Sequence, residues 1–166
     1  SEDVVLDFET NLSHVRWVIE GKLILEPGAR LNDAIILAEE GVELRGESSL
    51  NGRGLSRGSI DLGIASKASG WWATLGNVNN DSAYATINMQ SSEFHGTLIA
   101  LSGPRSMIDD YTSFSTGTSS DFQGFLLSPY PVRIHGEFYG SLWAYSLDCG
   151  SGNNCLGDAY IMEFPE

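Results

Sequence analysis

The chain repeats a seven-residue pattern of apolar and polar positions. The clearest copies are "FHGTLIA" (94–100) and "FYGSLWA" (138–144), and looser ones are "LNDAIIL" (31–37), "LNGRGLS" (50–56) and "FQGFLLS" (122–128). The copies begin 19, 44, 28 and 16 residues apart. Steps of 16 and 19 fit one coil of a β-solenoid, and 44 fits two coils with one degenerate copy. The pattern predicts an all-β, irregular β-solenoid in which each coil stacks on the next.

Most copies follow a segment in which apolar residues alternate with polar ones, as "VELRGESSL" (42–50) does. Alternation that ends at a glycine is typical of a strand, a turn and a second strand. The third position of the repeat is therefore the expected corner, occupied by Asp33 in the first copy and by glycine in the others. A helix that begins after Asn32 and ends at Gly41 is the alternative for the first copy. The match of the first copy to the four strand-like copies favours a strand.

On the strand interpretation, positions five and seven of the repeat face one way and position six faces the other. Position six is apolar in every copy: Ile36, Leu55, Ile99, Leu127 and Trp143. Apolar residues on both faces imply a sheet that is covered on both sides. The cover is either the chain's own loop excursions, such as "SGWWATL" (69–75) and "DDYTSFSTGTSSD" (109–121), or another molecule.

The composition fits one folded domain over residues 1–166 and limits its partners. Acidic residues number 22 and basic residues 9, for a net charge of −13. Such a surface repels nucleic acid and anionic bilayers, so neither is an expected partner. No apolar run is long enough to span a membrane, and the acidic start does not resemble a signal peptide.

Two cysteines, Cys149 and Cys155, flank a polar, Gly- and Asn-rich loop. Six residues apart across a flexible turn, they are expected to form a small disulfide, which predicts an extracellular or cell-surface location. Zinc is the alternative, but two cysteines without a nearby pair of histidines supply only half of a site.

The segment "LEPGARLNDAIILAEEGVELRGESSLNGRGLSRGSIDL" (25–62) resembles the β-solenoid ice-binding protein family. The matching features are a Gly-rich coil from Gly28 to Ala38 and an Asn-Gly-Arg corner at 51–53. Residues 122–144 more loosely resemble solenoid domains of bacterial pilus-associated and surface proteins. The first resemblance implies ice binding through a flat row of Thr, Ser or Ala. Position four, the expected outward row, departs from this because it reads Ala34, Arg53, Thr97, Phe125 and Ser141.

Several polar clusters are candidate sites. His95 and His135 would form an acid/base or metal cluster with Glu93 and Glu137 if their coils were adjacent, although polar residues at position two are also typical of a solvent-facing row. Calcium is the expected cofactor if there is one, because hard oxygen ligands gather on the cysteine loop: Asp148, Asn153, Asn154 and Asp158. A weaker calcium candidate combines Asp109, Asp110 and Asp121. A glycosidase would need paired carboxylates, for which Asp109, Asp110, Asp121 and Glu137 are available.

Aromatic residues are the remaining candidates for contact with a ligand or partner: Trp71, Trp72, Tyr130, Tyr139, Trp143 and Tyr145. Exposed Trp and Tyr stack on sugars and anchor protein partners, and buried ones fill cores. The sequence therefore favours a non-catalytic extracellular structural or adhesive domain that binds protein or glycan or assembles with itself. Ice binding and a carbohydrate-binding or carbohydrate-acting domain are the alternatives.

Overall fold

A computed structural model describes residues 2–75, 85–101, 112–150 and 155–161, with no side-chain description for residues 85 and 155–161. The described residues form fifteen strands and no helix. The strands are β1 (Val4–Leu6), β2 (Asn11–Ser13), β3 (Arg16–Ile19), β4 (Lys22–Leu25), β5 (Arg30–Ala38), β6 (Gly41–Leu44), β7 (Ser49–Ser56), β8 (Ser59–Leu62), β9 (Lys67–Thr74), β10 (Ala85–Met89), β11 (Glu93–Ala100), β12 (Thr112–Thr116), β13 (Asp121–Ile134), β14 (Glu137–Cys149) and β15 (Cys155–Ile161). Within the described ranges, no helix is long and apolar enough to cross a membrane.

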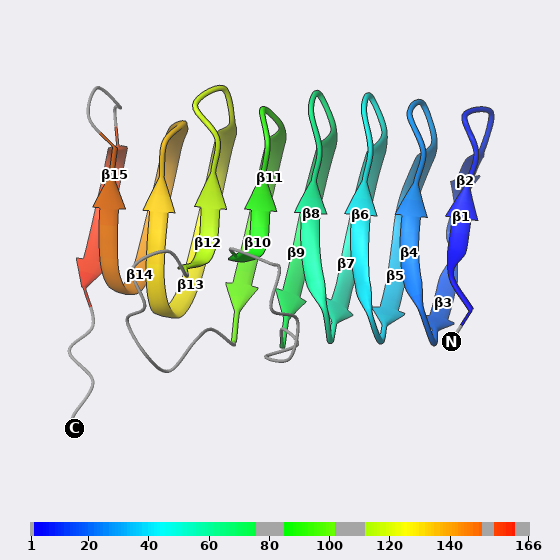
Figure 1. Cartoon of the computed structure of the whole chain (residues 1–166), viewed down its shortest axis with the longest axis horizontal. Helices are drawn as coiled ribbons and strands as arrows, with labels where there is room; N and C mark the ends of the chain where they lie inside the picture. Colours follow the sequence, from blue (N-terminus) through cyan, green and yellow to red (C-terminus); the bar gives the residue numbers. More distant parts are fainter. Residues whose placement is uncertain (1, 76–84, 102–111, 151–154, 162–166) are drawn as a thin grey trace.

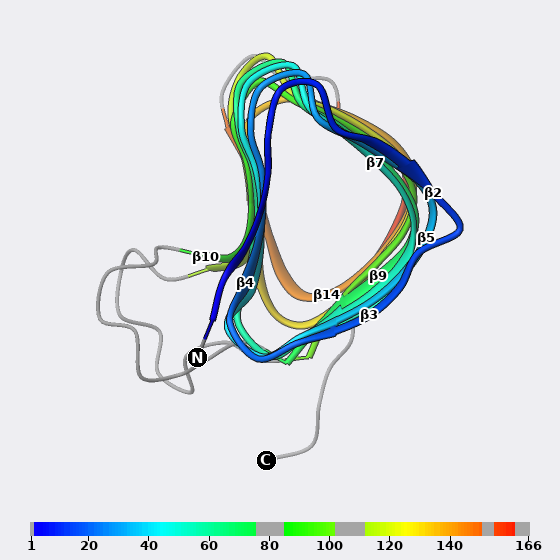
Figure 2. The same cartoon turned by 90° about the vertical axis from the view of Figure 1, so that its right-hand side faces the viewer.

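Every strand pair in the sheet is parallel, and the strands of successive coils lie side by side along the long axis (Figure 1). Viewed along that axis, the coils superimpose into an outline with three sides (Figure 2). Side A contains β1, β4, β6, β8, β10 and β12, together with the last residues of β13 and β14. The parallel all-β architecture fits the β-helix-like fold class that the sequence predicts.

The other two sides share long strands that bend at a corner. Side B contains β2 and the first residues of β5, β7, β9, β11, β13, β14 and β15, up to the corner. Side C contains β3 and those residues of the same long strands that come after the corner. Six glycines stack at this corner in register: Gly52, Gly70, Gly96, Gly124, Gly140 and Gly157. The third position of the repeat is thus a corner, as predicted.

The core lies inside the three sides and repeats from coil to coil. Position one supplies Leu31, Leu50, Phe94, Phe122 and Phe138, all buried. Phe122 stacks between two of these rings, with centroid distances of 5.5 Å to Phe94 and 4.9 Å to Phe138. Phe114 of side A meets the Phe122 ring edge-on at 5.8 Å. The repeat therefore places identical side chains on top of one another, which packs the core as a ladder.

The first copy departs from the predicted alignment by one residue. The register shifts between Leu31, which pairs with Leu50, and Ala34, which pairs with Gly52. Asp33 is therefore an extra residue, with a left-handed φ of 47°. As a consequence Ala34 and Ile36, expected to face outward, are buried at 1 % and 2 % exposure. The segment forms strand β5, so the helical alternative for this copy is wrong.

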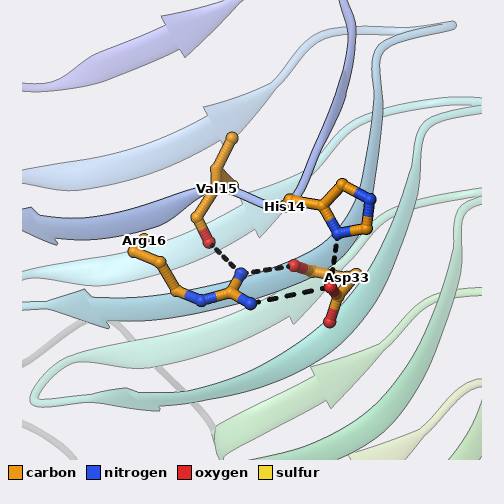
Figure 3. Close-up of polar contacts among 4 residues, drawn as sticks. All are labelled: His14, Val15, Arg16 and Asp33. Atoms are coloured by element: carbon orange, nitrogen blue, oxygen red, sulfur yellow. Dashed lines mark hydrogen bonds and ion pairs between the residues drawn. The ribbon is translucent and has the colours of Figure 1, made fainter.

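The corner of the first two coils is held by polar side chains (Figure 3). His14 has a φ of 59°, and its ring Nδ1 lies 2.6 Å from the Asp33 carboxylate. The Arg16 guanidinium donates to the backbone oxygens of Val15 and Asp33, each at 2.8 Å. These contacts stabilise a two-residue corner where the later coils have one glycine.

Two segments expected to be excursions are partly strands. Residues 69–74 belong to β9, which pairs with β7 and β11 through the corner glycines and is the degenerate coil of the 44-residue step. Its Trp72 is buried, at 1 % exposure, and donates its indole N–H to the carbonyl of Ser69. The ring lies in the space that Gly54 of the preceding coil leaves, where a Cβ would overlap it. Trp72 is therefore a core residue, and the expectation that it contacts a partner is wrong.

The Ser/Thr-rich segment 109–121 is the second segment that was expected to be an excursion and is partly a strand. Its residues Thr112–Thr116 form β12, which pairs with β10 and β13. Hydroxyls and backbone carbonyls pair there: Thr86 donates to the Ser113 carbonyl at 2.6 Å, and Ser113 donates to the Pro131 carbonyl at 3.0 Å. The Ser113 hydroxyl also contacts that of Ser128. Buried hydroxyls are tolerated because they are hydrogen-bonded, so polar composition did not make this segment a loop.

Candidate functional site

Side C carries the main candidate site, which we name the uncharged face. It consists of the outward register positions of β9, β11, β13 and β14 and the residue that follows β9 and β11. Its members are Trp71, Ala73, Leu75, Thr97, Ile99, Leu101, Phe125, Leu127, Ser141, Trp143 and Tyr145. None of these side chains is ionisable near neutral pH, although the chain has a net charge of −13.

Much of this face is exposed despite its apolar character. Trp71 and Leu101 are each 46 % exposed, Trp143 and Tyr145 each 42 %, and Leu75 39 %. Ala73 is the buried exception, and the remaining members are half-buried. Extended apolar surfaces of this kind are unusual on soluble proteins and commonly mark binding sites.

Position six forms the central row of the face. In register it runs from Val18 through Leu37, Leu55, Ala73 and Ile99 to Leu127 and Trp143. The predicted outward apolar row is thus present, with Leu37 in the place assigned to Ile36. Its neighbours in the repeat, such as Leu98 and Ala100, are buried, so positions five and seven face the core as predicted.

Charged side chains border the face on its N-terminal flank. Arg53 of β7 lies next to Trp71 in register, and Arg57 pairs with Glu39 at 2.9 Å. Position four on the face itself reads Trp71, Thr97, Phe125 and Ser141 on successive strands. This row mixes large rings with hydroxyls and so lacks the regular small residues that ice binding would require.

The aromatic members are positioned by the ladder beneath them. Phe125 and Trp143 form an edge-to-face pair with centroids 6.4 Å apart. Backbone pairing of β13 with β14 holds the two residues on neighbouring strands, because Phe125 pairs with Ser141 and Leu127 with Trp143. Of the sequence-predicted aromatic residues, this face therefore unites Trp71, Trp143 and Tyr145. The sequence did not indicate Phe125 and Leu101 as contact residues. Only the strand register shows which face of the sheet each of them lies on.

Tyr139 lies elsewhere, on side B. It is 40 % exposed, and its hydroxyl donates to the Glu137 carboxylate at 3.1 Å, which raises the pKa of Tyr139. Tyr130 is half-buried near the end of side C, and its backbone N–H donates to the hydroxyl of Ser128 at 3.2 Å.

Side B also holds the carboxylates expected as acid/base candidates. Glu93, Asp121 and Glu137 occupy the same register position on β11, β13 and β14. The ammonium of Lys67 pairs with Glu93 at 2.7 Å, and the Gln123 amide donates to Asp121 at 3.1 Å. Among the described residues, no group of three His, Cys, Asp or Glu side chains is arranged to hold a metal ion.

The two histidines that would form a cluster if their coils were adjacent lie on different parts of the coil. His95 lies on side B, between Ser69 and Gln123 in register. His135 follows the last residue of β13, and its backbone N–H donates to the Thr116 hydroxyl at 3.0 Å. The structure does not assemble the proposed histidine cluster.

The cysteine loop is described only at its edges. Cys149 ends β14 and is not a free thiol, and Cys155 begins β15. Because the side chain of Cys155 lies outside the described residues, their disulfide stays a prediction. Asp148 pairs with Arg133 at 3.2 Å, whereas Asn153, Asn154 and the side chain of Asp158 are not described. The calcium site therefore also stays a prediction, and Asp109 and Asp110 of the weaker candidate lie outside the described residues.

One further carboxylate lies on side A. Asp61 is partly buried between Glu43 and Asn88 in register, and burial raises its pKa. The hydroxyl of Ser59 donates to it at 2.6 Å. Its burial and its hydrogen bond from Ser59 indicate that Asp61 is a structural carboxylate.

Comparison of the chain with models of protein families, with curated proteins and with solved structures finds no significant match.

Proposed function

We propose that the chain is a β-solenoid with glycine corners and loop excursions, and that it serves as a non-catalytic adhesive domain at a cell surface. The observation that carries the proposal is the uncharged face, an exposed apolar and aromatic surface on an otherwise acidic protein. A surface of this composition is costly to leave in water, and binding a partner removes it from water.

Assignment to a solenoid is supported by the register. Each corner glycine pairs with the next one, and the same position of the repeat supplies the core phenylalanines of β11, β13 and β14. A rigid stack of this kind holds the exposed side chains of several coils in one plane. Such a support suits adhesion, because little conformational entropy is lost when the face is covered.

A binding role is supported over catalysis by where the charged groups lie. The carboxylates of side B are spread along one register position, and Lys67, Gln123 and Tyr139 each contact one of them. The face that carries the aromatic residues contains no acidic or basic side chain itself, and the ionisable residues in register with its position-four row, Arg53 and Asp158, lie at the two ends of that row. Location outside the cell rests on the predicted disulfide of Cys149 and Cys155.

The proposal is tested by binding of the fluorescently labelled chain to fixed bacterial, fungal and plant cells. We expect retention on at least one of these surfaces, with affinity lost in a Trp71→Ala/Trp143→Ala double variant. Tyr139→Ala is the matched control, because its ring is equally exposed but lies on side B. Equal loss in the control, or unchanged retention of the double variant, would contradict the proposal.

A further inference from the structure

Position four of the uncharged face alternates rings and hydroxyls. Trp71, Thr97, Phe125 and Ser141 lie on the successive strands β9, β11, β13 and β14. Because neighbouring strands are about 4.8 Å apart, the two rings are spaced by about 10 Å, with a hydroxyl group between them. That spacing is comparable to the length of a disaccharide in an extended, β-linked polysaccharide chain.

The shape of the face favours a flat ligand. Two concave sites of the described residues lie on the other sides. One is lined by side B residues around Asn51 and His95, the other by side A residues around Glu43 and Asp61. The uncharged face is built from parallel strands whose exposed residues are in register. A protein hot spot commonly fills a pocket, whereas a flat polysaccharide requires only a plane of rings.

Charge selects among flat partners. The net charge of −13 opposes approach of a second copy and of any anionic polymer or bilayer. A neutral polysaccharide meets no such repulsion, and the uncharged face itself carries no charged side chain to desolvate, because Arg53 and Asp158 lie beyond the two ends of its position-four row. Aromatic rings can stack on the apolar C–H faces of its sugars, while Thr97 and Ser141 can hydrogen-bond its hydroxyls.

We infer that the uncharged face binds a neutral, extended, β-linked polysaccharide. This inference rests on the proposed adhesive function and names the chemistry of the partner. Trp71 and Phe125 stack on alternate sugars along position four, and Trp143 extends the aromatic surface on β14.

The test is depletion of the full chain from solution by insoluble cellulose and by chitin, with carboxymethylcellulose beads as the anionic counterpart. We expect adsorption to cellulose or chitin and none to the anionic beads. A Trp71→Ala/Phe125→Ala variant should bind at least about tenfold more weakly, as loss of aromatic contact residues commonly does. Tyr139→Ala should bind as the unchanged chain does, and circular dichroism checks that each variant keeps its strands.

Absence of adsorption to both neutral polysaccharides, or equal adsorption by the Trp71→Ala/Phe125→Ala variant, would overturn the inference. A dimer in sedimentation experiments that the same substitutions dissociate would overturn it in favour of a second copy. If the cell-binding test succeeds while both polysaccharides fail, only the polysaccharide inference is wrong. If the unchanged chain is retained on none of the cell surfaces, the adhesive function itself is wrong, and if the Trp71→Ala/Trp143→Ala variant keeps its cell binding, the uncharged face is not the adhesive surface.

Discussion

At the corner between sides B and C, the later coils accept only one kind of residue. Gly96 has a φ of 140°, and a Cβ there would overlap the carbonyl oxygen of Gly70 on the neighbouring strand. The obstacle is backbone that is itself fixed by the parallel ladder, so it cannot move aside without breaking register. A glycine at position three is therefore a requirement of the stack.

Replacing Gly96 with alanine should lower the free energy of unfolding by at least about 2 kcal/mol, through backbone strain and overpacking. Gly117→Ala is the control, because its Cβ would meet its nearest neighbour at 3.5 Å, an ordinary contact. Thermal unfolding followed by circular dichroism measures both. Equal unfolding temperatures for the two variants would contradict this account of the corner.

The corner of the first two coils makes a different prediction, which depends on pH. The hydrogen bond with His14, with help from the nearby charge of Arg16, lowers the pKa of Asp33. A carboxyl whose pKa is lower in the folded chain contributes stability above its ordinary value of about 4 and loses it as the pH falls further. Asp33→Asn keeps the size and the left-handed preference but removes that contribution.

We therefore expect Asp33→Asn to be less stable than the unchanged chain at pH 7, by a difference that becomes smaller at pH 3. Asp7→Asn, an exposed change in the same coil, is the control. Chemical unfolding at both pH values measures the difference. A destabilisation by Asp33→Asn that is the same at pH 3 as at pH 7 would mean that the carboxylate charge does not hold this corner.

Single strands are coupled through the stacked rings of the core. Phe122 of β13 contacts Phe94 of β11, Phe138 of β14 and Phe114 of β12, so it joins three neighbouring strands. Phe122→Ala should lower the free energy of unfolding by about 3–5 kcal/mol, the usual range for a phenylalanine removed from a core. Phe125→Ala, three residues away on the same strand, should cost much less because its ring is half-exposed on side C.

Guanidinium unfolding of the two phenylalanine variants separates these effects. A larger loss for Phe125→Ala than for Phe122→Ala would contradict the assignment of the two sides of β13. The comparison also bears on the proposals above, because Phe125 must be replaceable without loss of the fold if its effect on binding is to be interpreted.

Strands could be predicted from the sequence where the repeat keeps both its large first residue and its glycine. β9 was missed because Ala68 stands where the two flanking coils have Leu50 and Phe94, while a tryptophan at position five, Trp72, fills the core instead. β12 was missed because its hydroxyls suggested a loop, and the sequence does not reveal that buried carbonyls accept them. The register shift at Asp33 was missed because an alignment without gaps cannot place an extra corner residue.

The whole molecule shows why the site was harder to predict than the fold. Alternation along a strand distinguishes inward from outward residues, so the apolar row at position six could be predicted. Which outward residues share a face depends on the register of strands up to 28 residues apart in the chain, such as β11 and β13. Trp71, Phe125 and Trp143 therefore become one surface only when the coils are stacked.

The central claim is that the uncharged face is the surface that binds, and hydroxyl-radical footprinting of the chain on a retaining cell surface tests it most directly. We expect oxidation of Trp71, Trp143 and Tyr145 to fall on binding. Oxidation of Tyr139 on side B and of Phe8, which is 71 % exposed in the first coil, should stay unchanged. Protection of Tyr139 or Phe8, with Trp71 and Trp143 still oxidised, would contradict the claim.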